Sequence, residues 1–196
     1  MRKLISLLFF ILLTQISSIS ASGSNEIKRI IIGNENAKIN IIAYESLTCS
    51  HCANFHIDVL PDLKKEYIDT GLAKIEFRHF PLDVTAFNAS KIAQCKNDGS
   101  LEVLNRLYLN QSKWIKGNTI DEVNENLKKF LISEGIKVDY DKCTTDKSIE
   151  DFILNDRIEG VKKFKVNATP TIIINDKKFE KSLNYKNLKK TLEKLI

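Results

Sequence analysis

The chain has 196 residues, 43% of them hydrophobic, and a formal net charge of +5. This length allows one domain that buries a sizeable core, and the charge is too small to indicate a nucleic-acid-binding protein. Four cysteines are too few for a scaffold held by many disulfides, so we expect them to serve chemistry plus one bridge.

The first 22 residues are typical of a secretory signal peptide. Arg2 and Lys3 precede an apolar run over residues 4–16, and a tract of small residues follows and ends at Ser22. The apolar run is shorter than the roughly 20 residues of a membrane-spanning helix, although an uncleaved anchor is an alternative. We therefore expect export to the periplasm, an oxidising compartment in which disulfides persist.

Two cysteines stand three positions apart where a predicted strand is followed by a predicted helix. The apolar run Ile39–Tyr44 indicates a buried strand, and apolar residues at helical spacing begin at Cys52. Unpaired N–H groups in the first turn of a helix stabilise a thiolate, and His51 adds a second stabilising group if it is protonated or donates a hydrogen bond. The sequence therefore predicts a lowered pKa for Cys49, the attacking sulfur, with Cys52 as the resolving thiol.

Two other interpretations of this Cys-x-x-Cys motif are less favoured. A zinc site would need a second pair of ligands at suitable spacing, and Cys95 and Cys143 stand alone and far apart. An inert structural disulfide would close so short a loop that it would stabilise little. His56 is predicted to be a surface or rim residue rather than a ligand, and His79 to be structural. We therefore expect no metal and no cofactor at this motif.

The elements next to the motif alternate between strands and a helix. Glu26–Ile32 is predicted to be an edge strand. Ala73–Phe80 is predicted to be a second strand, parallel to the first because a helix lies between them. Pro61 should kink or split that helix, which we expect to end at Gly71.

Residues 84–164 show helical periodicity and no convincing strand, which indicates an all-helical insertion. Trp114 is predicted to lie in the core or at its rim, at a junction between helices. Cys95 and Cys143 both fall in this region. A structural disulfide between them is the favoured interpretation, with two separate buried thiols as the alternative.

The sheet resumes in a β-branched run over residues 166–175. Pro170 must stand at the start of that strand, because proline cannot donate to the ladder. Residues 175–178 indicate a hairpin turn into 179–181, and an amphipathic helix over 184–196 closes the chain.

This order of elements and motifs resembles the thioredoxin superfamily, and more closely the DsbA-like exported thiol-disulfide oxidoreductases. The matching stretches are residues 44–60 around the Cys-x-x-Cys motif, Phe80-Pro81-Leu82, Ala168-Thr169-Pro170-Thr171 and the terminal helix. The resemblance implies an α/β chain with a thioredoxin fold and an inserted all-helical domain. Residues 23–82 and 165–196 would form the thioredoxin fold, and residues 83–164 the insertion.

The resemblance also implies roles for individual residues. The two cysteines of the motif keep the roles given above, and Ser50 and His51, which stand between them, tune their chemistry. Thr169 and Pro170 form a loop that faces the cysteines, and the peptide bond between them is cis. The backbone of this loop pairs with an extended substrate segment, as an added strand would.

The sequence departs from the family pattern at two positions. Ser50 replaces the proline of the familiar Cys-Pro-His-Cys motif, which leaves the redox poise open. Many relatives carry a buried acid six residues before the nucleophile, where this chain has Ala43. Glu45, on the same face of the strand, is a candidate to take over proton transfer.

The resemblance implies an exported oxidase that transfers its Cys49–Cys52 disulfide to reduced or unfolded secreted proteins. We expect a monomer that is re-oxidised by a DsbB-like membrane protein. A disulfide isomerase or reductase is the enzymatic alternative. Among relatives, a threonine before the proline, here Thr169, slightly favours this alternative. A non-catalytic peptide-binding module, or a metal-handling module that uses the two cysteines with His51 or His56, is the alternative from a different class.

Overall fold

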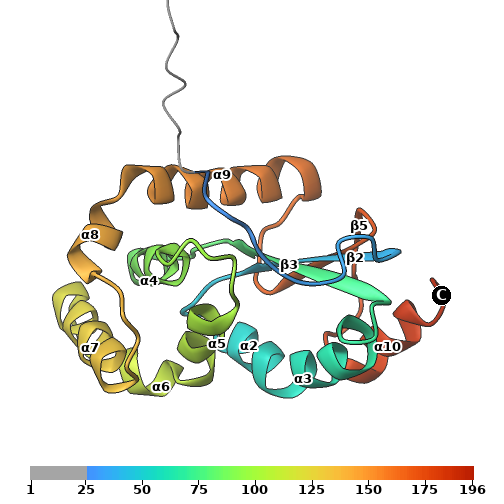
Figure 1. Ribbon diagram of the computed structural model, residues 1–196, viewed down its shortest axis with the longest axis horizontal. Helices are drawn as coiled ribbons and strands as arrows, with labels where there is room; N and C mark the ends of the chain where they lie inside the picture. The colour runs from blue at the N-terminus through green and yellow to red at the C-terminus, as the bar shows by residue number, and fades with distance from the viewer. Residues whose placement is uncertain (1–25) are drawn as a thin grey trace, which may run out of the picture.

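The structure of the protein, a computed structural model, describes residues 26–196. The predicted signal peptide, residues 1–22, lies outside the described residues. Within the described part, helices surround one sheet and also extend beyond one of its ends (Figure 1). Every helix in this part of the chain is too short or too polar to span a lipid bilayer.

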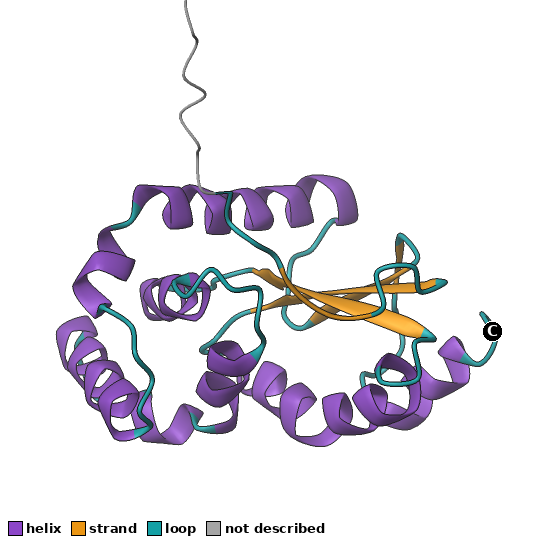
Figure 2. Cartoon of the chain, in the orientation of Figure 1, coloured by secondary structure: helices purple, strands orange, loops and turns teal. Residues whose placement is uncertain are grey.

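Five strands form the sheet within residues 26–196, in the order β1-β3-β2-β4-β5. Figure 2 shows the strands in orange, with purple helices on both sides of the sheet. They are β1 (Ile30–Gly33), β2 (Ile39–Glu45), β3 (Ala73–His79), β4 (Thr171–Ile174) and β5 (Lys177–Lys178). β2 and β3 are parallel, and the remaining pairs are antiparallel. The parallel pair is joined by a helical crossover, as parallel strands require.

The two central strands agree with the sequence pattern. β2 and β3 begin at the predicted residues, Ile39 and Ala73, and each ends within one residue of its prediction. Along β3 the buried residues alternate with half-buried ones, as expected for a strand covered more fully on one face. The predicted edge strand is present as β1 and lies at the edge of the sheet, but it is shorter than predicted and begins at Ile30.

The predicted hairpin is wrong in its turn. Asn175 and Asp176 both have positive φ angles, 45° and 62°, so the turn needs only these two residues. The second strand, β5, therefore begins at Lys177 rather than at residue 179. The closing helix is α10 (Tyr185–Leu192), capped by the Asn184 side chain, and it ends before the predicted C-terminal residue.

Pro61 interrupts the crossover helix, as predicted. The helix consists of α2 (Ser50–Asn54), the π-helical turn η1 (Phe55–Val59), α3 (Leu60–Leu63) and a second π-helical turn η2 (Lys64–Ile68). Pro61 lies in the first turn of α3, where a missing N–H costs no helical hydrogen bond. The chain then turns at Gly71, whose φ is 77°.

Between β3 and β4 the described chain is wholly helical. It forms α4 (Val84–Gln94), α5 (Glu102–Leu109), α6 (Gln111–Trp114), α7 (Ile120–Ser133), α8 (Tyr140–Thr145) and α9 (Lys147–Phe164). A disulfide joins Cys95, at the end of α4, to Cys143 in α8, with 5.5 Å between their Cα atoms. Trp114 lies in the core, where its indole N–H donates to the Leu107 carbonyl at 2.9 Å.

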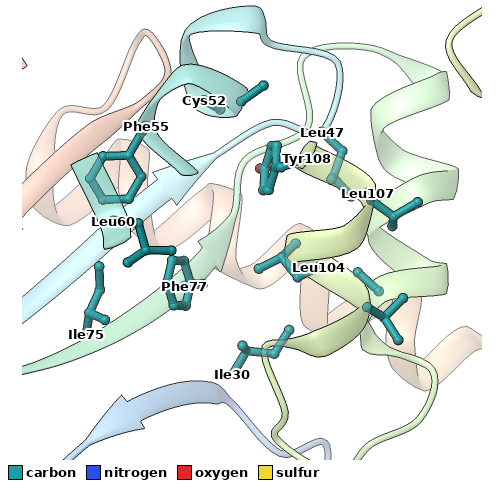
Figure 3. Close-up of a cluster of buried hydrophobic side chains, with 14 of the residues drawn as sticks. Ile30, Leu47, Cys52, Phe55, Leu60, Ile75, Phe77, Leu104, Leu107 and Tyr108 are labelled. Carbon is teal, nitrogen blue, oxygen red and sulfur yellow. The ribbon is translucent and has the colours of Figure 1, made fainter. Parts of the chain in front are cut away.

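Two hydrophobic cores lie on opposite faces of the sheet. The larger joins β2 and β3 to the crossover helix, to α5 and to α10, and includes Leu60, Phe77 and Leu104 (Figure 3). The smaller lies under α9 and consists of Ile42, Tyr44, Phe80, Phe164, Val166 and Ile173. Because helices cover both faces, the central strand β2 is buried along nearly its whole length.

Gly160 allows α9 to lie close to the sheet. A Cβ atom at this position would be 2.8 Å from Cε1 of Tyr44, so no larger residue fits without a shift of the helix or the ring. The Gly160 carbonyl also accepts a hydrogen bond from the Val166 N–H at 3.0 Å. The contact with the sheet and the end of the helix are thus fixed at the same residue.

A buried carboxylate also holds α9 on β3. Asp156 is fully buried and pairs with the guanidinium groups of Arg29 and Arg78. It also accepts the backbone N–H of His79 at 3.2 Å. The imidazole of His79 is buried and contacts Gln94 Oε1 at 3.2 Å, which agrees with the predicted structural role.

Candidate active site

The two cysteines of the motif lie at the start of α2 but differ in exposure. Cys49 is the N-cap residue, with extended backbone angles (φ −80°, ψ 117°), and it is half-buried. Cys52 lies in the first turn and is fully buried. Both are free thiols. A second protein can therefore reach the sulfur of Cys49 but not that of Cys52.

The surroundings of Cys49 favour its thiolate. The pKa of Cys49 falls from 9.0 to about 5, chiefly because the Cys52 thiol donates a hydrogen bond to it. Partial burial opposes this shift, whereas the Thr169 side chain and the backbone N–H groups of Cys52 and His51 contribute to it. The direction agrees with the prediction, and the N–H groups of the first helical turn take part as expected.

Cys52 is the opposite case. Burial raises its pKa, and the hydrogen bond to Cys49 adds to this effect because a donating thiol must keep its proton. The negative charge of Glu45 raises the pKa further. The pair therefore shares its charge unequally, with the thiolate on the exposed sulfur.

The dipeptide between the cysteines acts through its backbone. Ser50 and His51 are both exposed. The His51 backbone N–H is one of the groups that lower the pKa of Cys49, whereas the described structure shows no hydrogen bond from its imidazole to that sulfur. The imidazole lies instead on the wall of a groove beside the cysteines.

The loop before β4 faces Cys49. The Thr169–Pro170 peptide bond is cis, and the Thr169 carbonyl oxygen lies 3.3 Å from Cys49 Sγ. A thiol can donate to this carbonyl, but a thiolate cannot. The Thr169 hydroxyl is buried and lacks a partner within residues 26–196, so it is free to donate to the sulfur once the proton has left.

A groove of about 430 Å³ runs beside this site. Its walls come from the motif helix, the cis-proline loop and the segment before α10, and include His51, Phe55, Pro170, Leu183 and Tyr185. The groove is therefore lined by both polar and apolar side chains next to a reactive sulfur.

The prediction that His56 is a surface or rim residue is wrong. Its side chain is buried, and it stacks on Tyr108 with 4.1 Å between ring centroids. His56 stands four residues after Cys52, and residues at this spacing share one face of a helix. Since Cys52 faces the core, the same spacing could have placed His56 there.

The fold brings a further group from the helical insertion to the motif. The Gln111 side-chain amide donates to the carbonyls of Leu47 and Cys49, at 2.7 and 3.1 Å. These carbonyls lie where β2 passes into α2. Nothing in the sequence pattern singles out Gln111, because the contact joins residues more than sixty positions apart.

Within residues 26–196, no group of three or more His, Cys, Asp or Glu side chains is arranged to hold an ion. The two cysteines of the motif contact each other and the Thr169 loop instead.

Comparison with known proteins gives consistent results. A sequence profile described as Thioredoxin matches residues 25–194. The crystal structure of α-DsbA1 from Wolbachia pipientis superimposes with a TM-score of 0.75 and 31% sequence identity, over 85% of this chain and 90% of that chain. This match confirms the predicted fold, a thioredoxin-like α/β sheet with an inserted helical region.

Curated relatives point to the same group of proteins. Disulfide bond formation protein D of Bacillus subtilis is 25% identical over 186 residues, which cover 89% of this chain and 81% of the relative. Five Rickettsia proteins, provisionally named protein-disulfide oxidoreductases, are 27–30% identical. This chain spans only 52–61% of the length of those five proteins.

Proposed function

Because the chain belongs to the thioredoxin family, and within it to the DsbA-like proteins, we propose that it is a thiol-disulfide oxidoreductase. Its Cys49–Cys52 disulfide would be transferred to reduced protein substrates outside the cytosol. The observation that carries the proposal is the pairing of a half-exposed sulfur of low pKa with a buried thiol that donates to it.

The direction of transfer follows from this pairing. In the oxidised form, a substrate thiolate attacks Cys49 Sγ, the bond between the two cysteines breaks, and Cys52 leaves as a thiolate that takes up a proton. A second substrate thiolate then attacks the mixed disulfide and displaces Cys49, which is a good leaving group because its thiolate is stabilised. The substrate is oxidised, and both cysteines are reduced.

The groove and the cis-proline loop supply the substrate site in this proposal. An extended segment bound along the loop would pair with its backbone and would bring a substrate sulfur to Cys49, next to the Thr169 carbonyl. Ser50 and His51 would border the substrate on the other side.

Export and re-oxidation complete the proposal. The relatives are proteins of disulfide formation, and disulfides persist only in oxidising compartments. We therefore propose that the protein acts in the periplasm, and we propose separately that it acts as a monomer. A DsbB-like membrane protein would return the cysteines to the disulfide.

A trapping experiment tests this function. In a Cys52→Ala variant the mixed disulfide on Cys49 cannot be resolved from within the protein, so disulfide-linked client proteins should accumulate in cells and dissolve under reducing conditions. The matched control is Cys49→Ala, which keeps one thiol but should trap nothing, because Cys52 is buried. In vitro, the oxidised wild-type protein should also oxidise a reduced, unfolded protein. The absence of both trapped clients and substrate oxidation would contradict the proposal, whereas rearrangement of wrong disulfides without net oxidation would favour an isomerase.

A further inference from the structure

Behind the two cysteines lies a buried polar cluster formed by Glu45, His56 and Asn105. Glu45 ends β2, His56 follows the motif in η1, and Asn105 comes from α5 of the helical insertion. His56 Nε2 lies 3.0 Å from Glu45 Oε2, and His56 Nδ1 lies 2.9 Å from Asn105 Oδ1. The side chains of Glu45 and His56 are only 2% and 0% exposed, so water does not screen their charges.

The contacts determine where the protons of this cluster lie. Asn105 Oδ1 can only accept, so His56 Nδ1 carries a hydrogen and donates it. One proton then lies between His56 Nε2 and Glu45 Oε2, either on the imidazole or on the carboxyl group. In both arrangements the net charge of the pair is zero. This makes the pair compatible with a buried position.

The cluster also has a free acceptor close to the cysteines. Glu45 Oε1 is buried and has no hydrogen-bond partner among the described residues. His56 is one helical turn after Cys52, and both side chains belong to the surface that α2 and η1 turn towards the sheet. Figure 3 shows Cys52 and Tyr108, the ring on which His56 stacks, in one cluster of buried side chains.

We propose that Glu45 accepts the proton of the Cys52 thiol and returns it, and that His56 and Asn105 are the positioning residues that make this transfer possible. The charge of Glu45 already acts on Cys52, whose pKa it raises after burial and the hydrogen bond to Cys49.

The proton balance of disulfide closure illustrates the role. Cys49 first forms a mixed disulfide with an external disulfide, which is the oxidant. The Cys52 proton then moves to Glu45 Oε1, and the pair, which was neutral before it gained this proton, carries a positive charge that balances the new thiolate. Cys52 Sγ bonds to Cys49 Sγ, the external sulfur leaves as a thiolate, and the surplus proton passes to solvent. In the opposite direction, Cys52 leaves as a thiolate and recovers a proton from the pair.

Few other titratable groups face this cluster. From α2 it is faced by the two cysteines, and from α5 by Tyr108, whose pKa burial and then the charge of Glu45 raise. From β3 the nearest is His79, which pairs with Glu45 in the strand register but contacts Gln94. Burial lowers the pKa of His79, which disfavours the uptake of a second proton by this imidazole.

Single-turnover kinetics with oxidised glutathione tests the inference without any protein client. Reduced protein forms the mixed disulfide on Cys49, and acid-quenched samples give the rate of ring closure by Cys52 between pH 5 and pH 8. Closure in Glu45→Gln should be at least about tenfold slower at pH 6 and should depend on hydroxide, because the general base is gone. His56→Gln should slow closure less and shift the inflection of its pH profile.

His79→Gln is the matched control, since it also replaces a buried imidazole next to Glu45 but leaves the pair intact. It should keep the wild-type rate and pH profile. Alkylation of Cys49 against pH reports whether the site itself is intact, and its midpoint should remain near the wild-type value in every variant. Unchanged closure in Glu45→Gln or His56→Gln would overturn the inference. A variant in which closure is slow and the alkylation midpoint of Cys49 is also shifted would overturn it too, because the replaced residue would then have a structural role.

The inference rests on the proposed redox role of the cysteines, but the two can fail separately. A wild-type protein that does not close its disulfide with glutathione would contradict the proposed function. Normal closure in the wild type, together with normal closure in the Glu45 variant, would contradict only the inference.

Discussion

The chain contains two pairs of cysteines that differ in their spacing and in what surrounds them. Cys49 and Cys52 lie in one helical turn, next to a groove and to a loop that faces their sulfurs. Cys95 and Cys143 are 48 positions apart, join two helices of the insertion and are bonded to each other. Exposure does not separate the pairs, because Cys49 and Cys95 are half-buried whereas Cys52 and Cys143 are fully buried.

This difference shows that position, rather than residue type, decides what a cysteine pair does. A helix start and a facing loop stabilise a thiolate and so favour exchange. A bridge across a long stretch of chain restricts the unfolded state and so favours stability. The two pairs can be compared directly, because they are in the same protein and both can form disulfides.

The largest expected effect is the loss of the long bridge. In the loop-entropy estimate, closing 48 residues stabilises the fold by about 4 kcal/mol, whereas closing the short loop of the Cys-x-x-Cys motif contributes about 2 kcal/mol. Urea unfolding under oxidising conditions should therefore show about twice the loss of unfolding free energy in a Cys95→Ala/Cys143→Ala variant as in a Cys49→Ala/Cys52→Ala variant. The Cys95→Ala/Cys143→Ala variant, once reduced, should keep the low alkylation midpoint of Cys49. Equal losses from the two pairs would show that loop length does not govern their difference.

The second expected effect is a pH dependence that belongs to the motif alone. The thiol of Cys49 has a pKa of 9.0 ordinarily and about 5 in the reduced folded protein. Between these values the unfolded state binds more protons than the folded state, so the unfolding free energy of the reduced protein rises with pH. The gain is complete near pH 9 and is lost as the pH falls through about 5. In thermal unfolding, the stability of the reduced form should rise relative to that of the oxidised form from pH 5 to pH 8. Parallel curves for the two forms would contradict this.

The smallest expected effect concerns one hydroxyl group of the facing loop. Thr169→Val keeps the shape of the side chain but removes the group that is free to donate to the Cys49 thiolate. A hydrogen bond to a charged group contributes about 1.5–3 kcal/mol, so the alkylation midpoint should rise from about 5 to about 6 or higher. Thr171→Val is the matched control, because the Thr171 hydroxyl donates to the Ala168 carbonyl at 2.7 Å and not to the sulfur. Equal alkylation midpoints in the two variants would show that the Thr169 hydroxyl does not lower the pKa of Cys49.

Much of the fold could be predicted from local pattern. The alternation in β3, the apolar run of β2 and the break at Pro61 each reflect a preference that neighbouring residues express by themselves. The predicted extent of the hairpin turn was wrong, because the turn depends on positive φ angles at Asn175 and Asp176, which the sequence allows but does not require.

Some residues of the candidate site could also be predicted from local motifs, whereas others could not. Cys49, Cys52 and Pro170 follow from motifs that are short and specific. Glu45 could be singled out as a candidate because it shares a strand face with the position of the missing acid. The contacts of His56 with Asn105 could not be predicted, because they depend on how α5 packs against the crossover helix. Long-range packing therefore supplies the polar cluster behind a site whose reactive atoms the local sequence already indicates.

The glycine at which α9 meets the sheet has a consequence for the site. Gly160 fixes the height of α9 above Tyr44, and its carbonyl holds the chain where the helix gives way to the segment that leads to Thr169. Any bulkier residue there would have to lift the helix, and the chain downstream would be displaced with it. A position that touches neither sulfur nor substrate would in this way set how closely the facing loop approaches the reactive thiol.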